Sequence, residues 1–273
     1  MSLLPRKDAS ELVAIALSAA RSAGAHVLRG WRKNPTAEHK GRIDLVTKFD
    51  RESETLLREL LGKSTRFPVV GEEQGGDRAS AEEPTWYVDP IDGTTNFVHG
   101  HPFWCVSIGL FVGQHPALGV VVAPSLGVEW TGIVGQTAER NGETCRVSEV
   151  GTLDDALLAT GFPYDRRTSQ DNNFDAFVAI KRKCQAVRRC GSAAIDLCSV
   201  ADGTYDGYWE RKLKPWDMGA GVPIVLAAGG RVTDYEGQDT DLRVGHIVAT
   251  NVRLHDELVA ALGTVPLSLG SLG

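Results

Sequence analysis

The stretch Trp86-Tyr87-Val88-Asp89-Pro90-Ile91-Asp92-Gly93-Thr94-Thr95-Asn96-Phe97 carries most of the information about this chain. Its apolar start, Trp86 to Val88, predicts a buried strand that ends at two carboxylates three residues apart. Hard divalent cations are bound by several anionic oxygens, and phosphate is bound by free backbone N–H groups at a helix N-terminus. The stretch offers both, so it predicts metal-assisted phosphate chemistry.

The corner around Pro90 predicts how these groups are arranged. Proline has a fixed φ and no N–H, so we expect it to end the hydrogen-bond ladder of the strand and to hold Asp89 in an extended conformation. The side chains of Asp89 and Asp92 would then face one cavity, and the carbonyl of Ile91 would lie outside any ladder as a further oxygen ligand. An ordinary strand-to-turn corner is the alternative, because Asp-Pro and Asp-Gly are common in turns.

Two residues after the corner complete this prediction. Gly93 lets the backbone approach a ligand closely, because it has no Cβ. The hydroxyl of Thr94 is placed to hold and polarise a water. A helix beginning here would direct its free N–H groups at a bound phosphate.

Two further acidic motifs lie far from this stretch. The first is a short apolar run followed by an acidic, glycine-rich loop, Val69-Val70-Gly71-Glu72-Glu73-Gln74-Gly75-Gly76. The second is a predicted helix start with a proline at its beginning, Lys214-Pro215-Trp216-Asp217-Met218-Gly219-Ala220-Gly221. Asp217 would lie in the first turn, where the helix dipole favours a carboxylate. Simple N-capping is the alternative for Asp217 taken alone.

Taken in order, the three motifs give the chain a resemblance to the inositol monophosphatase family, which are Mg²⁺-dependent, lithium-sensitive phosphomonoesterases. The resemblance runs from Leu12 to Leu262 and includes three flanking pieces: Asp44–Asp50, Gly191–Asp196 and Tyr208–Glu210. It implies the layered αβαβα sandwich of the inositol monophosphatase and fructose-1,6-bisphosphatase type. Relatives are commonly homodimers, so the resemblance also implies a homodimer.

The resemblance implies two metal sites that share one carboxylate. The first has Glu72, Asp89 and the Ile91 carbonyl as its ligands, and the second has Asp89, Asp92 and Asp217. Glu72 also resembles the family's ligand to a third, more weakly held ion. Two or three Mg²⁺ ions are therefore expected in the active site.

The resemblance also implies which residues activate the attacking water. Thr94 with Glu72 matches the pair that activates it, while Asp50 and Thr47 match positions that support it. A phosphate monoester is a dianion that repels hydroxide, and two Mg²⁺ ions can hold the attacking and leaving oxygens and lower the pKa of water. We therefore expect in-line attack by a metal-activated water without a phosphoenzyme.

The remaining site positions concern the substrate. The backbone N–H groups of Gly93 and Thr94 match the phosphate cradle of the family, and Ala193 and Glu210 match positions that contact the alcohol portion of inositol phosphate. Lys40 matches a family lysine near the site.

The identity of the alcohol is left open by the sequence. Glu210 suits a polyol, because a carboxylate can accept hydrogen bonds from two vicinal hydroxyls, but it suits the ammonium of histidinol equally well. The basic residues that follow, Arg211, Lys212 and Lys214, argue against a site exclusive to inositol. The leading prediction is inositol-1-phosphate hydrolysis, with a histidinol-phosphatase or a broad sugar-phosphate or fructose-bisphosphate phosphatase as alternatives. A non-catalytic, metal-binding regulatory partner is the alternative from a different class.

A second basic segment joins Lys181-Arg182-Lys183 to Arg188-Arg189. The pattern is typical of a solvated helix end and strand. A substrate-facing arginine in this segment is the alternative.

Composition limits the ligands and the cellular location that can be expected for this chain. The chain has 273 residues, of which 42% are hydrophobic, and a formal net charge of -6. This mild acidity argues against nucleic acid as the main ligand. The 5 cysteines are an odd number without paired spacing, which predicts reduced thiols and a cytoplasmic protein. We expect no membrane span, because no apolar run approaches the required length.

The pattern of elements predicts two halves that form one compact unit. Residues 1–150 read as an α+β half with an antiparallel sheet and most metal ligands, and residues 151–273 as an α/β half that completes the site. We expect helices over Ser10–Trp31, Arg51–Leu61, Phe174–Lys183, Ser192–Ala201, Trp216–Ala228 and Leu254–Leu262. We expect strands over Pro68–Val70, Trp86–Val88, Phe103–Val112, Ala117–Val122, Val128–Val134, Thr144–Val147, Leu157–Thr160, Gln185–Arg189, Tyr205–Glu210, Arg231–Thr233 and Ile247–Thr250.

Overall fold

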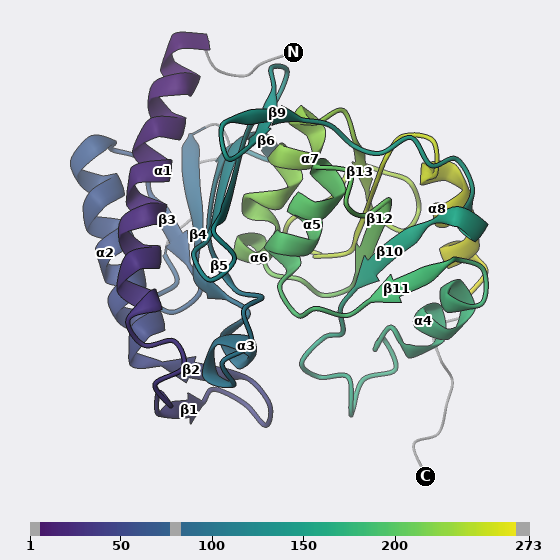
Figure 1. Cartoon of the computed structure of the whole chain (residues 1–273), viewed down its shortest axis with the longest axis horizontal. Helices are drawn as coiled ribbons and strands as arrows, with labels where there is room; N and C mark the ends of the chain where they lie inside the picture. Colours follow the sequence, from purple (N-terminus) through teal and green to yellow (C-terminus); the bar gives the residue numbers. More distant parts are fainter. Residues whose placement is uncertain (1–5, 77–82, 266–273) are drawn as a thin grey trace.

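The computed structural model describes residues 6–76 and 83–265, which form five layers (Figure 1). The outer helices α1 (Arg6–Leu28) and α2 (Lys48–Ser64) cover one face of a seven-stranded sheet with the order β3-β4-β5-β6-β7-β8-β9. Its strands are β3 (Val69–Gly71), β4 (Pro84–Asp92), β5 (Cys105–Val112), β6 (His115–Ala123), β7 (Val128–Ile133), β8 (Ala138–Arg140) and β9 (Glu143–Cys145). All neighbours in this sheet are antiparallel except β3 and β4.

Three central helices separate this sheet from a second one. They are α5 (Ala193–Ala201), α6 (Pro215–Gly219) and α7 (Gly221–Ala227). The second sheet has the order β11-β10-β12-β14-β13, and its strands are β10 (Leu157–Thr160), β11 (Ala186–Arg188), β12 (Gly207–Glu210), β13 (Arg231–Thr233) and β14 (Ile247–Thr250). The outer helices α4 (Phe174–Lys181) and α8 (His255–Gly263) close the far side. The predicted αβαβα sandwich is therefore confirmed.

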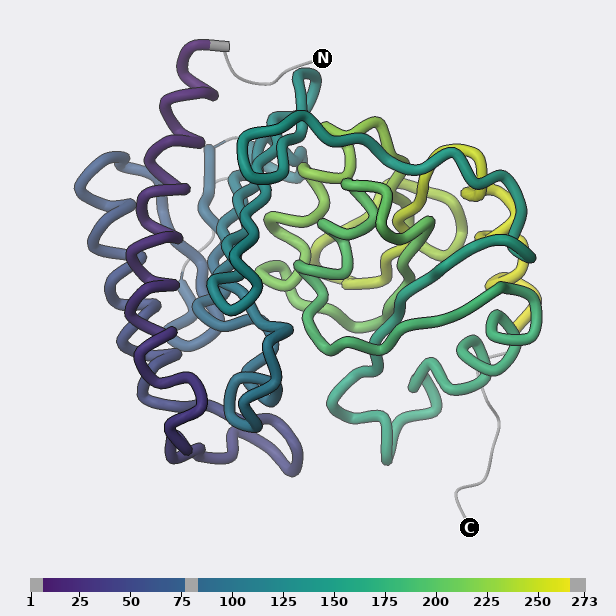
Figure 2. The backbone as a smooth tube through the Cα atoms, in the orientation of Figure 1, coloured from purple at the N-terminus to yellow at the C-terminus, as the bar shows by residue number. Residues whose placement is uncertain are grey.

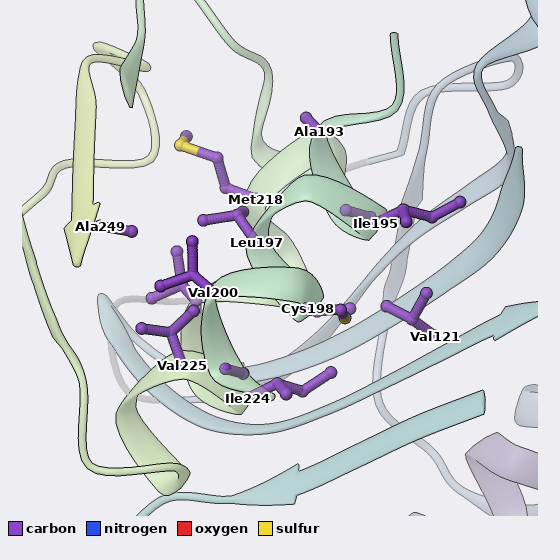
Figure 3. Close-up of a cluster of buried hydrophobic side chains, with 14 of the residues drawn as sticks. Val121, Ala193, Ile195, Leu197, Cys198, Val200, Met218, Ile224, Val225 and Ala249 are labelled. Atoms are coloured by element: carbon purple, nitrogen blue, oxygen red, sulfur yellow. The ribbon is translucent and has the colours of Figure 1, made fainter. Parts of the chain in front are cut away.

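One hydrophobic cluster joins the two sheets through the central helices (Figure 3). Val121 comes from the first sheet, Ala249 from the second, and Leu197 and Val225 from the helices between them. All four side chains are fully buried. Both sheets thus share one core, although the predicted division of the chain near residue 150 stays a prediction.

Helix α1 begins and ends earlier than the sequence analysis predicted, since it spans Arg6–Leu28 instead of Ser10–Trp31. Its stretch Lys7–Leu28 is long and apolar enough to cross a membrane by length and composition, so the expectation that nothing approaches a span was wrong. Small buried side chains such as Ala16 and Ala20 pack this helix against α2 and β6. A core helix of a folded protein meets the same criteria.

The prediction that Pro90 ends the strand was also wrong. Strand β4 continues to Asp92, with Asp89 opposite Ser107 and Asp92 opposite Cys105. The register shifts between the two aspartates. This irregularity of the β-bulge type accommodates Pro90, which has no N–H to donate to the neighbouring strand. A bulge of this kind turns side chains to a new direction, which is useful beside a binding site.

The helix predicted over Trp216–Ala228 is divided into α6 and α7. Two glycines of the first sheet explain how closely this segment approaches it. A Cβ at Gly109 would lie 1.8 Å from the carbonyl oxygen of Gly219, and one at Gly119 would lie 2.1 Å from that of Ala220. Only glycine permits this contact, and the contact brings Asp217 to the end of β4.

Several short elements were missed or misplaced. The hairpin of β1 (Ala37–His39) and β2 (Leu45–Thr47) and the 3₁₀ turn η1 (Leu153–Asp155) were not assigned, whereas the helix expected to begin after Gly93 is the short α3 (Thr94–Val98). The strand predicted at Thr144–Val147 is found as β9, which ends at Cys145 and pairs with the unassigned β8.

Candidate active site

The predicted metal-ligating residues line one cavity of about 160 Å³. Glu72 follows β3, Asp89, Ile91 and Asp92 end β4, and Asp217 lies in the first turn of α6. The same cavity is lined by the predicted residues Lys40, Gly93 and Thr94. Segments that are far apart in the sequence therefore supply the lining.

Each aspartate on β4 has one oxygen held by the protein. Asp89 Oδ1 accepts from the backbone N–H of Ile91 at 2.9 Å. Asp92 Oδ2 accepts from Ser192 Oγ at 2.6 Å and from Ala194 N at 2.7 Å. These bonds fix the two carboxylates, both of which are less than a tenth exposed.

Asp217 and Glu72 are fixed in different ways. Asp217 Oδ2 accepts from the backbone N–H of Lys214 at 2.7 Å, so it does cap its helix, as the alternative proposed. This bond leaves Oδ1 for a ligand. Glu72 Oε1 accepts from Lys40 Nζ at 2.8 Å, and the same ammonium also contacts Glu73.

Burial and mutual repulsion shift the pKa values of these carboxyls. Burial raises the pKa of Asp89 well above its usual range, and the charges of Glu72, Asp92 and Asp217 add to the effect. Burial also raises the pKa of Glu72 to about 7, although Lys40 opposes the shift. Negative charge thus predominates in the cavity despite Lys40, and cations bound within it would relieve the repulsion.

The donor set fits a hard divalent cation, because it consists of carboxylate and carbonyl oxygens. Across residues 6–76 and 83–265, however, no three His, Cys, Asp or Glu side chains already lie close enough together to hold an ion. A bound cation would therefore require these carboxylates to move closer together.

Thr94 is held by a buried carboxylate beneath the cavity. Its hydroxyl lies 2.9 Å from Asp50 Oδ1 and 3.0 Å from the carbonyl of Ile91. Asp50 Oδ2 accepts from both N and Oγ1 of Thr47, at 2.7 and 2.6 Å. The hydroxyl of Thr94 thus contacts Asp50, whereas Glu72, its predicted partner, contacts Lys40.

Helix α3 begins directly after Gly93. Gly93 has a φ of 96°, and a Cβ there would lie 2.9 Å from the carbonyl oxygen of Phe103. Asn96, which the sequence analysis did not single out, donates to the carbonyls of Phe103 at 2.7 Å and Cys190 at 2.8 Å. These bonds connect the start of α3 to the loop before α5. The start of α3 and this loop both line one larger pocket.

This larger pocket has a volume of about 570 Å³ and shares Asp92, Gly93, Thr94 and Asp217 with the smaller cavity. Ala193 and Glu210, the predicted alcohol-binding residues, lie in its lining. Glu210 accepts from the hydroxyl of Tyr208, and burial raises its pKa to about 7. We call this space the leaving-group pocket and the smaller one the acidic cavity.

Glu54 is a second residue that sequence reasoning missed. It is fully buried on α2 and accepts from the backbone N–H groups of Glu73 at 2.7 Å and Gln74 at 3.0 Å. It therefore shapes the loop that carries Glu72. Its spacing from the buried Leu57 and Leu61 places it on the apolar face of the helix, and that pattern could have revealed it.

Comparisons with known proteins agree with this geometry. The sequence model described as the inositol monophosphatase family matches residues 8–266. An inositol-1-monophosphatase from Synechocystis is 42% identical, over 95% of this chain and 91% of the relative. The solved structure of an inositol monophosphatase from Anabaena matches with a TM-score of 0.86 and 40% identity, covering 94% of this chain and 97% of that chain. A Pseudomonas aeruginosa protein named Nus factor SuhB is 38% identical, over 91% of this chain and 94% of the relative.

Proposed function

Because the chain belongs to the inositol monophosphatase family, we propose that it is a Mg²⁺-dependent phosphomonoesterase that hydrolyses inositol-1-phosphate to myo-inositol and phosphate. The observation that carries this proposal is the shared lining of two spaces. The acidic cavity meets the leaving-group pocket at Asp92, Gly93 and Thr94. A phosphate bound at this junction would have the carboxylates on one side and the alcohol on the other.

The metal ligands follow from the donor set of the acidic cavity. Glu72, Asp89 and the Ile91 carbonyl would hold a first Mg²⁺, and Asp89, Asp92 and Asp217 a second, with Glu72 available to a third, lithium-sensitive position. When bound, these ions supply positive charge to the phosphate oxygens and lower the pKa of water.

The attacking water is oriented by residues of the chain itself. The hydroxyl of Thr94 donates a hydrogen bond to Asp50, which leaves its oxygen to accept a hydrogen bond from the water. The two bonds from Thr47 hold Asp50 in place. The carboxylate of Glu72, which lines the same cavity, would take the proton of the water.

The phosphate and the alcohol are held by separate groups. The N–H groups of Gly93 and Thr94, at the start of α3, bind the phosphate oxygens. Glu210 and Ala193 contact the alcohol, where the carboxylate of Glu210 accepts hydrogen bonds from neighbouring hydroxyls. The same carboxylate would suit histidinol phosphate, and a broad sugar-phosphate specificity is the other alternative.

A second function is favoured by one comparison. Because relatives named Nus factor match over nearly the whole chain, a regulatory partner that binds metal without turnover is the competing proposal. The bond between Thr94 and Asp50 supports the enzyme, since a non-catalytic scaffold has no use for an oriented hydroxyl beside the carboxylates.

The cellular setting is proposed from the thiols and from relatives. All five cysteines are unpaired, which suits a reducing cytoplasm. We further propose a homodimer whose main ligand is a small phosphate monoester, with neither nucleic acid nor a membrane in that role.

Phosphate release from a panel of substrates tests the proposal. Inositol-1-phosphate, histidinol phosphate, fructose-1,6-bisphosphate and p-nitrophenyl phosphate should be compared with and without Mg²⁺. The proposal expects Mg²⁺-dependent release that is fastest with inositol-1-phosphate, abolished in Asp217→Asn and unchanged in the exposed control Asp239→Asn. Release from none of the substrates would favour the regulatory partner, and a higher rate with histidinol phosphate would replace the substrate.

A further inference from the structure

Helix α2 lies beside strand β3 and the loop that follows it, residues 72–76, which we call the ligand loop (Figure 2). Among the described residues of this loop, only Glu72 lines the acidic cavity. The ligand loop belongs to no helix or strand, unlike the aspartates at the end of β4. The position of Glu72 therefore depends on contacts that the loop makes with its neighbours.

Glu54 of α2 holds the inner side of the ligand loop. Its side chain is fully buried, and its carboxylate accepts from the backbone N–H groups of Glu73 at 2.7 Å and Gln74 at 3.0 Å. The N–H of Glu73 belongs to the planar peptide unit that contains the carbonyl of Glu72, so this bond orients the backbone that carries the Glu72 side chain. Gly71 leaves room for the carboxylate, because a Cβ there would lie 2.4 Å from Glu54 Oε1.

Arg58, one turn further along α2, holds the two ends of the ligand loop. Its guanidinium donates to the carbonyl of Val69 at 2.8 Å, before the loop, and to the carbonyl of Gly75 near its end. Arg58 Nε also donates to Glu54 Oε1 at 2.9 Å. The planar fork of arginine can reach several acceptors at once. Glu54 and Arg58 thus hold the loop together, and we call this pair the clamp.

The face of α2 that carries the clamp also carries Asp50. Asp50, Glu54 and Arg58 follow one another at intervals of four residues, which places them on one side of the helix. The carboxylate of Asp50 accepts from the hydroxyl of Thr94 at 2.9 Å. One helix therefore positions both the hydroxyl proposed to orient the water and the loop that carries Glu72.

The ligand loop needs such support because Glu72 faces other carboxylates. Burial raises the pKa of Asp89 and of Asp217 well above the usual range, and the charges of Glu72 and Asp92 raise both values further. In the absence of a cation, this repulsion favours turning Glu72 away from the cavity. The bonds of the clamp are made by the protein alone and oppose that movement. A cation then meets a loop that is already ordered, which increases its affinity.

We propose that Glu54 and Arg58 keep the ligand loop in its cation-binding conformation before an ion arrives, and that they thereby determine the cation affinity at Glu72. Neither residue is in the lining of the acidic cavity, so both are positioning residues that do not take part in the chemical step. This inference rests on the metal ligands of the proposed function and adds the residues that hold one of those ligands in place.

The dependence of inositol-1-phosphate hydrolysis on Mg²⁺ concentration tests the clamp. In Glu54→Gln the side chain keeps its size but has one acceptor oxygen and no charge for Arg58. We expect the half-saturating Mg²⁺ concentration to rise at least about tenfold, with kcat at saturating Mg²⁺ within about threefold of the wild type. Arg58→Lys keeps the charge and loses the fork, so its half-saturating concentration should rise by a smaller factor.

Glu59→Gln is the matched control for these variants. Glu59 is exposed on the same helix and pairs with Lys63 at 3.9 Å, so the substitution changes the charge of α2 by the same amount without touching the clamp. Its Mg²⁺ dependence should equal that of the wild type.

Two measurements on the metal-free protein do not depend on turnover. In hydrogen exchange, the amides of Glu73 and Gln74 should be protected in the wild type and in Glu59→Gln, and should exchange faster in Glu54→Gln. Titration with Mn²⁺, followed by the electron paramagnetic resonance signal of the free ion, should show a site that is weakened at least about tenfold in Glu54→Gln. Thermal unfolding identifies the variants that fold, and Arg58→Lys provides the test if Glu54→Gln does not fold.

Two results would overturn the clamp and leave the proposed function intact. One is an unchanged Mn²⁺ affinity in the folded variants. The other is a fall in kcat at saturating Mg²⁺ with an unchanged half-saturating concentration, which would assign these residues to the chemical step. Absence of Mg²⁺-dependent hydrolysis by the wild type would instead overturn the proposed function, and the exchange and Mn²⁺ measurements would still decide the clamp. A wild type that binds no Mn²⁺ would overturn both.

Discussion

The acidic cavity and the leaving-group pocket are adjacent, yet their charges are arranged in opposite ways. In the cavity, Asp89, Asp92 and Asp217 crowd together with raised pKa values and form no ion pair within the described residues. In the pocket, Arg166 and Arg189 form no ion pair within 4.0 Å with a carboxylate of the described residues. The first arrangement favours the binding of cations, whereas the second places uncompensated positive charge beside the alcohol. The chemistry at phosphorus and the choice of alcohol are thus carried by separate groups that can be changed independently.

The largest expected effect comes from the carboxylates of the cavity. Asp89→Asn removes the charge proposed to be shared by two ions, so we expect kcat to fall at least about a thousandfold for every substrate. Asp217→Asn should behave alike, because its free oxygen is lost as an anionic ligand. Steady-state assays on inositol-1-phosphate and p-nitrophenyl phosphate measure this. A fall in kcat for only one of the two substrates would show that the acidic cavity and the leaving-group pocket do not act separately.

A smaller but still uniform effect is expected at Thr94. Thr94→Val keeps the volume and removes the hydroxyl that orients the water, so kcat should fall about a hundredfold. Thr94→Ser retains the hydroxyl and should recover most of the rate. If the valine and serine variants have equal rates, the bond to Asp50 serves the structure alone.

Cation binding should also stabilise the fold through the acidic cavity. At a Mg²⁺ concentration about a hundred times the dissociation constant, linkage predicts a gain of about 2.7 kcal/mol in the free energy of unfolding. For a chain of this size the gain corresponds to a rise in Tm of roughly 5–10 °C. Calorimetry at matched ionic strength measures it, and Asp89→Asn should lose most of the rise. Equal Tm values in Mg²⁺ and in a sodium salt would contradict the account.

The smallest expected effect lies in the pocket and depends on pH. Burial raises the pKa of Glu210 to about 7, so its carboxyl is protonated below that pH and ionised above it. Only the ionised form accepts hydrogen bonds through both oxygens. The ratio of kcat/KM for inositol-1-phosphate to that for p-nitrophenyl phosphate should therefore fall, by up to about tenfold, between about pH 8 and about pH 6.

Glu210→Gln is the control for this pH effect. Its amide cannot titrate, so the ratio should stay constant over the same range. Taking a ratio cancels the titration of the acidic cavity, which affects both substrates. A pH-dependent ratio in Glu210→Gln would assign the effect to another group.

The sequence predicted much of this structure because its informative residues act locally. The apolar run before Asp89 and the proline before Asp217 both gave elements near their observed positions. Likewise, the strand Leu157–Thr160 was predicted with its observed bounds, since its apolar run ends at a glycine. The three acidic motifs, chosen from their residue types and order, line one cavity.

What the sequence did not reveal depends on contacts between distant segments. Pro90 was expected to end a strand, but pairing with β5 carries the strand past it through the irregularity. Asn96 reads as an ordinary polar residue until the loop at Cys190 folds against it. Arg166 lies in a loop without a regular pattern, and its relation to Arg189 arises only from the tertiary structure.

The number of divalent ions bound by the protein tests the central claim most directly. Titration with Mn²⁺ in the presence of inorganic phosphate, followed by the electron paramagnetic resonance signal of the free ion, counts the bound ions. The account predicts at least two ions in the wild-type protein and none held tightly in Asp89→Asn, because that carboxylate is proposed to be shared. A wild-type protein that binds no Mn²⁺, or an Asp89→Asn variant that binds the wild-type number with unchanged affinity, would contradict it.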